Sequence, residues 1–274
     1  MMKIALIQQH ATRDKQNNLK RSIQSFKKAA AAGAQVVCFA ELAFEPFYPQ
    51  KRADGAVIHL AETIPGPITD MFTAMAKEYG IVTILNLFEK ENNLTYDTSP
   101  VIDADGTLLG KTRMTHIPDY EYFHEKTYYT PGDTGVPVYE TAVGKIGVAI
   151  CYDRHYPEYM RALAVGGAEL VITPQAGAVG EWTDGLYEAE MQVTAFQNGY
   201  FTALCNRVGR EDKLEFSGES FVCSPDGIVL ARANSGRDEI LFCDIDLTLV
   251  KQAHARRLFM EDRRPDLYNK WITK

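Results

Sequence analysis

Tight turns between short apolar runs are the feature that most restricts the fold of this chain. Ala104-Asp105-Gly106, Val143-Gly144 and Pro225-Asp226-Gly227 each separate two strand-like segments, and such turns join neighbouring antiparallel strands. Elsewhere strand-like and helix-like segments alternate. A purely parallel doubly wound sheet is excluded, because the two strands of a hairpin pair antiparallel. The sequence predicts an α/β fold with mixed sheets, organised as one domain over residues 1–274.

The expected elements run along the whole chain without a linker or a change in composition. Strands are predicted over residues 3–8, 35–39, 81–88, 101–103, 108–112, 138–141, 145–150, 169–174, 200–206, 220–224, 228–231 and 239–244. Helices are predicted over residues 17–32, 68–79, 157–165 and 186–197, three of them followed directly by a glycine.

Charge and cysteine usage exclude several classes of function. The net charge of -7 argues against nucleic acid or an anionic membrane as the main partner. No apolar run reaches membrane-spanning length, and the apolar run at the N-terminus is too short for a signal peptide. The five cysteines are widely spaced and form no C-x-x-C pair, so neither a disulfide framework nor a zinc site is indicated. We expect a reducing, cytoplasmic setting.

Cys151 is the first candidate for chemistry, because it follows the apolar run Val148-Ala149-Ile150 at an expected strand-to-helix turn. Free amides at a helix N-terminus favour a thiolate and can also stabilise an oxyanion. These properties predict a nucleophile that attacks a carbonyl. The alternative is a structural cysteine, since free cysteines are among the most buried residues.

Glu41 is the second candidate, because it follows the buried strand that includes Val37-Cys38-Phe39-Ala40. Burying a carboxylate without a partner is costly, and active-site groups collect at strand ends in α/β sheets. Near a cysteine, a glutamate can accept the thiol proton and later activate water. A helix cap or a structural salt bridge is the alternative.

Several ordered motifs together resemble the nitrilase superfamily of carbon–nitrogen hydrolases. They are Phe39-Ala40-Glu41-Leu42, Gly110-Lys111-Thr112-Arg113 with His116-Ile117-Pro118, Glu125, Tyr128-Tyr129-x-Pro131-Gly132-Asp133, the Cys151 segment, and Asp262-Arg263-Arg264-Pro265-Asp266-Leu267-Tyr268. The resemblance implies a four-layer α-β-β-α sandwich that forms homo-oligomers. It also implies a Glu–Lys–Cys triad supported by a second glutamate. Glu41 matches the general base, Cys151 the nucleophile and Glu125 the second glutamate.

The family lysine has no match in this chain. Met114 stands in its place, between Arg113 and the Thr115-His116-Ile117-Pro118 segment. Lys111 lies three residues earlier, and an odd offset on a strand points to the opposite face. Lys111 can replace the family lysine only if the strand bulges or shifts its register. Lys126, which follows Glu125, is another possible replacement. Losing one oxyanion donor commonly costs about 10²–10³ in rate.

Arg154 is the residue that bears on the substrate. A guanidinium suits a carboxylate, and in relatives that act on N-carbamoyl amino acids a basic residue lies three positions after the cysteine. Tyr152, Arg154 and His155 are therefore predicted to bind substrate, with an ion pair to Asp153 or Glu158 as the structural alternative for Arg154.

The predicted function is hydrolysis of a small linear amide or N-carbamoyl compound, best an N-carbamoyl amino acid, through a thioester on Cys151. This chemistry needs no cofactor, and nitrile hydrolysis is the less favoured variant. A non-catalytic binding or regulatory protein on the same scaffold is the alternative, because of Met114. The apolar C-terminal segment, residues 247–274, is expected to lie in the interface of a homodimer or higher oligomer.

Overall fold

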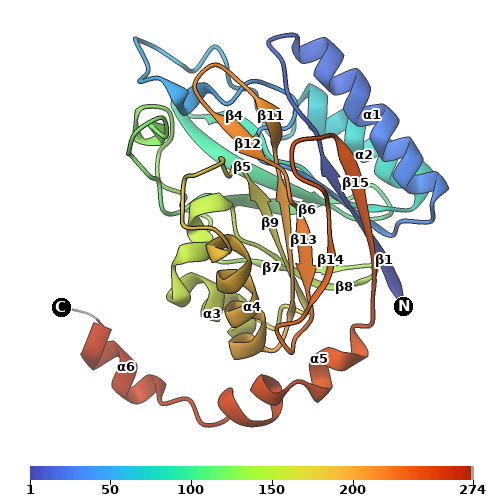
Figure 1. Cartoon of the computed structure of the whole chain (residues 1–274), viewed down its shortest axis with the longest axis vertical. Coiled ribbons are helices and arrows are strands. Elements are labelled where there is room, and N and C mark those ends of the chain that lie inside the picture. Colours follow the sequence, from blue (N-terminus) through green and yellow to red (C-terminus); the bar gives the residue numbers. More distant parts are fainter. Residues whose placement is uncertain (273–274) are drawn as a thin grey trace.

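The computed structural model describes residues 1–272, which form two β-sheets packed face to face between two layers of helices (Figure 1). The first sheet has the order β15-β1-β2-β3-β5-β4, with β6 paired to β5. Its strands are β1 (Met2–Gln8), β2 (Val36–Phe39), β3 (Val82–Ile84), β4 (Leu87–Glu91), β5 (Leu94–Ile102), β6 (Leu108–Arg113) and β15 (Glu239–Ile245). Parallel pairs β1–β2 and β2–β3 adjoin antiparallel pairs, so the sheet is mixed, as predicted.

The second sheet has the order β14-β13-β10-β9-β8-β7 and is also mixed. Its strands are β7 (Val138–Thr141), β8 (Gly144–Val148), β9 (Leu170–Gln175), β10 (Phe201–Asn206), β13 (Phe221–Cys223) and β14 (Val229–Arg232). A small separate hairpin pairs β11 (Val208–Arg210) with β12 (Glu215–Ser217). All three predicted hairpins are present, as the antiparallel pairs β5–β6, β7–β8 and β13–β14.

Alternating side chains on the buried strands explain the layers. In β1, Ile4 and Leu6 face the second sheet, whereas Ala5 and Ile7 pack with the helices α1 (Lys15–Ala31) and α2 (Pro67–Tyr79). The helices α3 (Pro157–Val165) and α4 (Leu186–Asn198) cover the outer face of the second sheet. The inner strands β2, β9 and β10 are buried on both faces, and their sequences are therefore continuous apolar runs.

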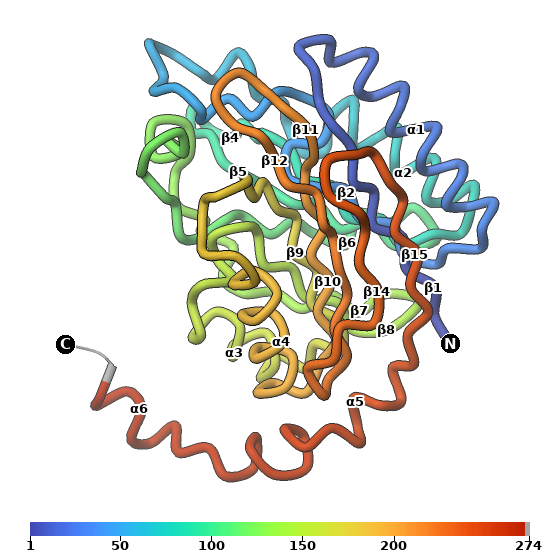
Figure 2. The backbone as a smooth tube through the Cα atoms, viewed as in Figure 1, coloured from blue at the N-terminus to red at the C-terminus, as the bar shows by residue number. Residues whose placement is uncertain are grey.

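The C-terminal segment leaves this body as an extended arm (Figure 2). It contains α5 (Thr248–Gln252), a π-helical turn at Ala255–Phe259 and α6 (Pro265–Ile272). Arg256 fastens the first half of the arm to the body by donating to the carbonyl oxygens of Ala164, Ala168 and Gly199. Within residues 1–272, no helix is long and apolar enough to cross a membrane.

Candidate active site

Cys151 lies just after β8 at a strained backbone position. Its φ is 41°, in the left-handed region that residues other than glycine adopt at a cost, often at functional sites. A 3₁₀ turn, Cys151–His155, follows, and α3 begins only at Pro157. The side chain is 6% exposed. The sulfur is therefore held in a fixed, nearly enclosed position between the second sheet and the loops around it.

The expectation that helix amides favour a Cys151 thiolate is wrong. Burial raises the pKa of the Cys151 thiol well above its ordinary value, and the charges of Glu41 and Glu125 raise it further. The guanidinium of Arg154 and the N–H of Ala176 act in the opposite direction, with smaller effects. The thiol is therefore protonated at neutral pH, and it needs a base before it can attack a carbonyl carbon.

Glu41 lies beside that thiol. It follows β2, its carboxyl group is fully buried, and its charge acts on the Cys151 thiol. Neither of its oxygens has a hydrogen-bond partner among the described residues. Burial raises the pKa of Glu41 well above its ordinary value, and the charges of Asp97 and Glu125 add to the shift. A raised pKa makes the carboxylate a stronger base toward the thiol.

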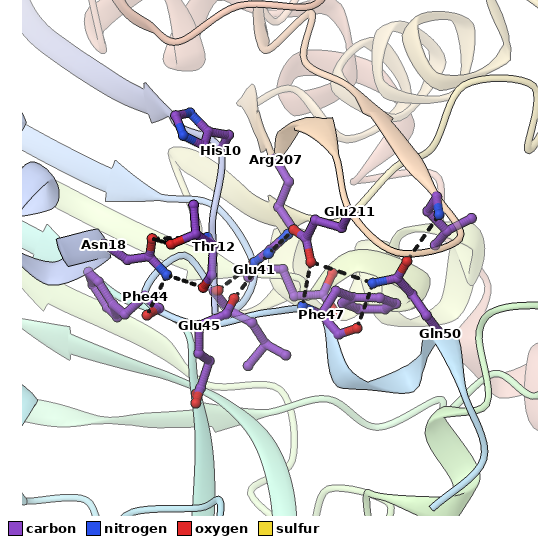
Figure 3. A network of polar contacts seen from close by, with 12 residues as sticks. His10, Thr12, Asn18, Glu41, Phe44, Glu45, Phe47, Gln50, Arg207 and Glu211 are labelled. Carbon is purple, nitrogen blue, oxygen red and sulfur yellow. Dashed lines mark hydrogen bonds and ion pairs between the residues drawn. The ribbon is translucent and has the colours of Figure 1, made fainter. Parts of the chain in front are cut away.

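Arg207 holds the loop that positions Glu41, and sequence reasoning missed it. This fully buried guanidinium donates to the carbonyl oxygens of Glu41, Leu42 and Glu45 and pairs with Glu211 (Figure 3). Leu42 has a φ of 46°, so the loop adopts a costly turn that these bonds fix. The sequence did contain a signal for Arg207, because it is a charged residue directly after the apolar strand over residues 200–206. The same pattern had identified Glu41.

Glu125 lies in the same enclosed space. It begins a 3₁₀ turn, Glu125–Thr127, and neither carboxyl oxygen has a hydrogen-bond partner within residues 1–272. Burial raises the pKa of Glu125 well above its ordinary value, and the charges of Asp97, Glu181 and Asp153 add to it. Burial and the charges of Asp97, Glu125 and Glu41 raise the pKa of the buried Tyr129 hydroxyl. Glu41, Glu125 and Cys151 are thus brought together from three distant segments.

Met114 occupies the position expected of the family lysine, and neither substitute lysine lies in this site. Met114 is fully buried after β6. Lys111 instead pairs with Glu89 and with Glu91, 3.0 Å away, on an ion-pair cluster that also includes Arg113. Lys126 is exposed. The odd offset between Lys111 and Met114 thus separates their side chains.

Asp97 is the second residue that sequence reasoning missed. It lies within β5, fully buried, and close enough to Glu41 for its charge to raise the pKa of that carboxyl group. Asn86 Nδ2 donates to Asp97 Oδ1 at 2.5 Å. Burial raises the pKa of Asp97 to about 7, against the lowering effect of the hydrogen bond from Asn86. The site thus contains an additional carboxyl group next to the candidate base.

The three predicted substrate-binding residues lie together beside Cys151. Tyr152, Arg154 and His155 line a cavity of about 680 Å³ between α3 and α4. Cys151 and Glu41 do not line this cavity, so it adjoins the reacting groups through Arg154. A second cavity, of about 500 Å³, lies on the side of Tyr120 and Glu181, which share a hydrogen bond of 2.5 Å.

The guanidinium of Arg154 is buried, and only some of its N–H groups donate hydrogen bonds within the protein. Its Nη1 donates to Cys151 O and Gln175 Oε1, both at 2.8 Å, and Nε lies 3.1 Å from Glu190. The expected alternative partners, Asp153 and Glu158, are not the ones observed, because Asp153 accepts from His116. Nε and Nη2 are both buried without a hydrogen-bond partner among the described residues, so part of the donor capacity of the guanidinium is unused within the protein.

Comparisons with known proteins agree with this geometry. The sequence pattern of the family described as Carbon-nitrogen hydrolase matches residues 3–255. The chain belongs to the carbon–nitrogen hydrolase family. It is 35% identical to N-carbamoylputrescine amidase of Solanum lycopersicum, over 100% of this chain and 95% of that protein. It is 31% identical to citrullinase of Francisella tularensis, over 100% of this chain and 99% of that protein.

Solved structures of carbon–nitrogen hydrolases share the fold along the whole chain. The carbon–nitrogen hydrolase from Helicobacter pylori superposes with a TM-score of 0.92 at 30% identity, covering 100% of this chain and 99% of that one. A mutant of the amidase from Nesterenkonia sp. superposes with a TM-score of 0.83 at 25% identity, covering 99% and 97%. That amidase shows covalent addition of the acetamide moiety of fluoroacetamide at its active-site cysteine.

Proposed function

We propose that this carbon–nitrogen hydrolase cleaves a small linear amide or N-carbamoyl compound through a thioester on Cys151. The observation that carries the proposal is that the buried carboxyl group of Glu41 lies close enough to the buried Cys151 thiol for its charge to raise the pKa of that thiol. A nucleophile beside a base of raised pKa is the arrangement that covalent acyl transfer requires. The second buried glutamate, Glu125, lies within the same space.

The reaction proceeds in two halves. Cys151 Sγ attacks the carbonyl carbon while Glu41 accepts the thiol proton, and the intermediate collapses as Glu41 returns that proton to the departing amine or ammonia. Water then gives a proton to Glu41 and attacks the thioester, releasing the acid and restoring the thiol. Because Cys151, Glu41 and Glu125 are buried, bulk water is excluded during the first half of the reaction. This favours transfer of the acyl group to the Cys151 thiol over direct hydrolysis.

An N-carbamoyl amino acid is the substrate class that we favour. The relatives named N-carbamoylputrescine amidase and citrullinase act on compounds that carry a carbamoyl or ureido group. The unpaired Nη2 of Arg154 is a donor that suits a substrate carboxylate, with which it would form a charge-assisted hydrogen bond. Tyr152 and His155 line the cavity into which the rest of such a substrate extends.

A substrate panel tests this proposal. We expect N-carbamoyl amino acids to give the highest kcat/KM among carbamoyl amino acids, carbamoyl amines, ω-amides and nitriles, with Cys151→Ala as the blank. Arg154→Gln should lower kcat/KM for a carbamoyl amino acid by about tenfold more than for a carbamoyl amine of equal length, since one charge-assisted hydrogen bond is worth about 1.5–3 kcal/mol. Equal losses for both substrates would remove the carboxylate assignment. No turnover of any compound above the blank would favour a non-catalytic binding protein.

We further propose that residues 1–274 form one carbon–nitrogen hydrolase domain that assembles as a homodimer or higher oligomer in the cytoplasm. Support for the subunit interface comes from exposed apolar side chains on α4 and the arm, which are Leu186, Val193, Phe196, Leu258, Phe259 and Trp271. Contiguous apolar surface of this kind commonly marks an interface. The five cysteines are free, which suits a reducing compartment.

Light scattering tests the assembly. We expect a mass of at least twice the 30.7 kDa of the chain at micromolar concentration. A variant with Leu258→Asp and Phe259→Asp should dissociate, because two charges would be buried in the interface without partners. A monomer in the unmodified protein would contradict the proposal. Residues 273 and 274 of the expected interface segment lie outside the described residues.

A further inference from the structure

Met114 lies next to a buried carboxyl group, that of Asp97. In the β5–β6 pair, Thr98 is opposite Arg113, and Met114 N donates to Asp97 O at 2.9 Å. Residues that face each other across two antiparallel strands project their side chains on the same side of the sheet. Met114 packs in the core between the two sheets. The side chain of Asp97 therefore projects into the same space.

Hydrogen bonds connect this position to the loop that carries Glu41. Asn86 Nδ2 donates to Asp97 Oδ1 at 2.5 Å. Asn86 Oδ1 accepts from the backbone N of Leu42, the residue after Glu41, at 2.8 Å. One amide side chain therefore holds the strand of Asp97 against the start of this loop.

The residue after Met114 connects the same position to the nucleophile. The backbone N of Thr115 donates to Asp153 Oδ2 at 3.1 Å, and Asp153 belongs to the 3₁₀ turn that begins at Cys151. Met114 and Cys151 are also members of one apolar cluster between the two sheets. An uncharged thioether thus lies in the site where the family has an ammonium group.

The carboxyl groups of this site have no cation beside them. Both oxygens of Glu41, both of Glu125 and Oδ2 of Asp97 are buried, and none of them has a hydrogen-bond partner within residues 1–272. The two basic residues of β6, Lys111 and Arg113, form their ion pairs elsewhere. Burying carboxylates without partners is costly, and the charges of Asp97 and Glu125 act on Glu41. The site therefore suits a ligand that brings a positive charge.

We propose that the reacting group of the substrate is itself the missing cation, so that this site hydrolyses a guanidino acid. Such a compound has the shape of an N-carbamoyl amino acid, with a charged C=NH₂⁺ in place of the C=O. The flat N–H groups of a guanidinium match carboxylates, and Glu41, Glu125 and Asp97 supply the acceptors. Nη2 of Arg154 takes the carboxylate end, as for an N-carbamoyl amino acid. The inference rests on the proposed cysteine hydrolysis at Cys151.

A cationic reacting group explains why the lysine is dispensable. When a thiolate adds to a carbonyl group, the oxygen becomes negative and needs a donor such as an ammonium group. When a thiolate adds to a guanidinium carbon, the positive charge is cancelled and the intermediate is neutral. A lysine in place of Met114 would repel the substrate, because like charges repel strongly in a buried site. Met114 removes that repulsion.

The reaction balances with water as the only co-substrate. Cys151 Sγ bonds to the guanidinium carbon, the C=N electron pair moves onto nitrogen, and Glu41 accepts the thiol proton. Glu41 gives this proton to one nitrogen, the C–N bond breaks, and ammonia leaves a cationic isothiourea on Cys151. Water gives a proton to Glu41 as its oxygen bonds to the same carbon. The C–S bond then breaks, sulfur takes the proton from Glu41, and ammonia takes the remaining proton. The products are a ureido acid and ammonium.

Binding to Cys151→Ala tests the preference for a cation before any chemistry. Guanidinoacetate and N-carbamoylglycine are the probes, because they differ only in C=NH₂⁺ against C=O. By calorimetry, we expect guanidinoacetate to bind at least about tenfold more tightly, since hydrogen bonds between charged groups are the stronger ones. Equal binding, or tighter binding of N-carbamoylglycine, overturns the inference.

A lysine introduced at the same position tests the role of Met114. In the Cys151→Ala background, Met114→Lys should weaken guanidinoacetate binding by at least about tenfold, whereas Met114→Leu, of similar volume and uncharged, should keep the preference for the cation. Thermal unfolding identifies a Met114→Lys protein that does not fold, in which case the comparison of the two probes in Cys151→Ala decides alone. A folded Met114→Lys protein with the same preference as Met114→Leu overturns the inference.

Turnover gives the functional test. The unmodified enzyme should convert guanidinoacetate to N-carbamoylglycine and ammonium with a higher kcat/KM than it shows for hydrolysis of N-carbamoylglycine. Met114→Lys should reverse this order, because the ammonium group repels the cation and supplies an oxyanion donor worth about 10²–10³ in rate.

The outcomes separate the two proposals. Hydrolysis of N-carbamoylglycine by a protein that neither binds nor hydrolyses guanidinoacetate would remove this inference and leave the proposed function in place. Tighter binding of guanidinoacetate, with no turnover of either compound above the Cys151→Ala blank, would remove the hydrolysis, the proposed function included, and leave only a site for a cation.

Discussion

Replacing Cys151 with alanine is expected to lower kcat/KM by about 10⁴-fold or more, to the level of the uncatalysed background. The thiol is the proposed nucleophile, and alanine removes it while leaving the strained backbone position in place. The measurement is the rate of hydrolysis of a carbamoyl amino acid, detected through the ammonia or free amine that is released.

Cys223→Ala is the matched control for that loss. Cys223 is also buried and free, and it packs with α4. The Cys223→Ala substitution should lower the free energy of unfolding, because packing volume is lost. It should leave kcat/KM close to that of the unmodified enzyme. If Cys151→Ala keeps more than a small fraction of the activity while Cys223→Ala loses it, the nucleophile has been assigned to the wrong cysteine.

Replacing Glu41 with glutamine is expected to lower kcat/KM by about 10²–10⁴-fold, the usual contribution of a positioned general base. The amide has the same shape but cannot accept the thiol proton. Because the pKa of the Cys151 thiol is raised well above its ordinary value, few thiolates exist without this base. The residual rate should therefore increase as the pH rises toward the thiol pKa, since hydroxide then removes the proton.

A pH series of kcat/KM for Glu41→Gln, with thermal unfolding measured alongside, checks this prediction. Glu62→Gln, at the half-buried glutamate outside the site, should behave as the unmodified enzyme. A Glu41→Gln variant with full activity at neutral pH and an unchanged profile would show that another group accepts the proton.

Sequence patterns predicted the architecture because the signals were local. The hairpin turns and the apolar runs of β1, β2, β9 and β10 depend on neighbouring residues alone, and they indicate a mixed α/β fold and the strand ends where Glu41 and Cys151 lie. The opposite placement of Lys111 and Met114 likewise follows from the period of a strand. The four-layer sandwich and the role of Glu125 were predicted instead from the resemblance to the nitrilase superfamily.

Two parts of the site were not predictable in this way, because they depend on distant partners. The pKa of the Cys151 thiol is raised first by burial and then by the charges of Glu41 and Glu125, which together outweigh the N–H of Ala176. Asp97 lies in the polar first half of β5, whereas the sequence indicated a strand only over residues 101–103. A carboxyl group is costly inside a strand, and the hydrogen bond that Asn86 donates to Asp97 Oδ1 forms only after folding brings the two residues together.

The most direct test of the central claim is to identify the atom that carries the acyl group. The protein is mixed with a slowly hydrolysed amide or carbamoyl substrate, quenched in acid, and measured by intact mass spectrometry and peptide mapping. We predict one adduct per chain, with the mass of the acyl or carbamoyl group, on the peptide that contains Cys151, and none in Cys151→Ala. An adduct on Cys38, Cys205, Cys223 or Cys243, or turnover without any adduct under conditions in which deacylation is slower than acylation, would contradict a thioester mechanism at Cys151.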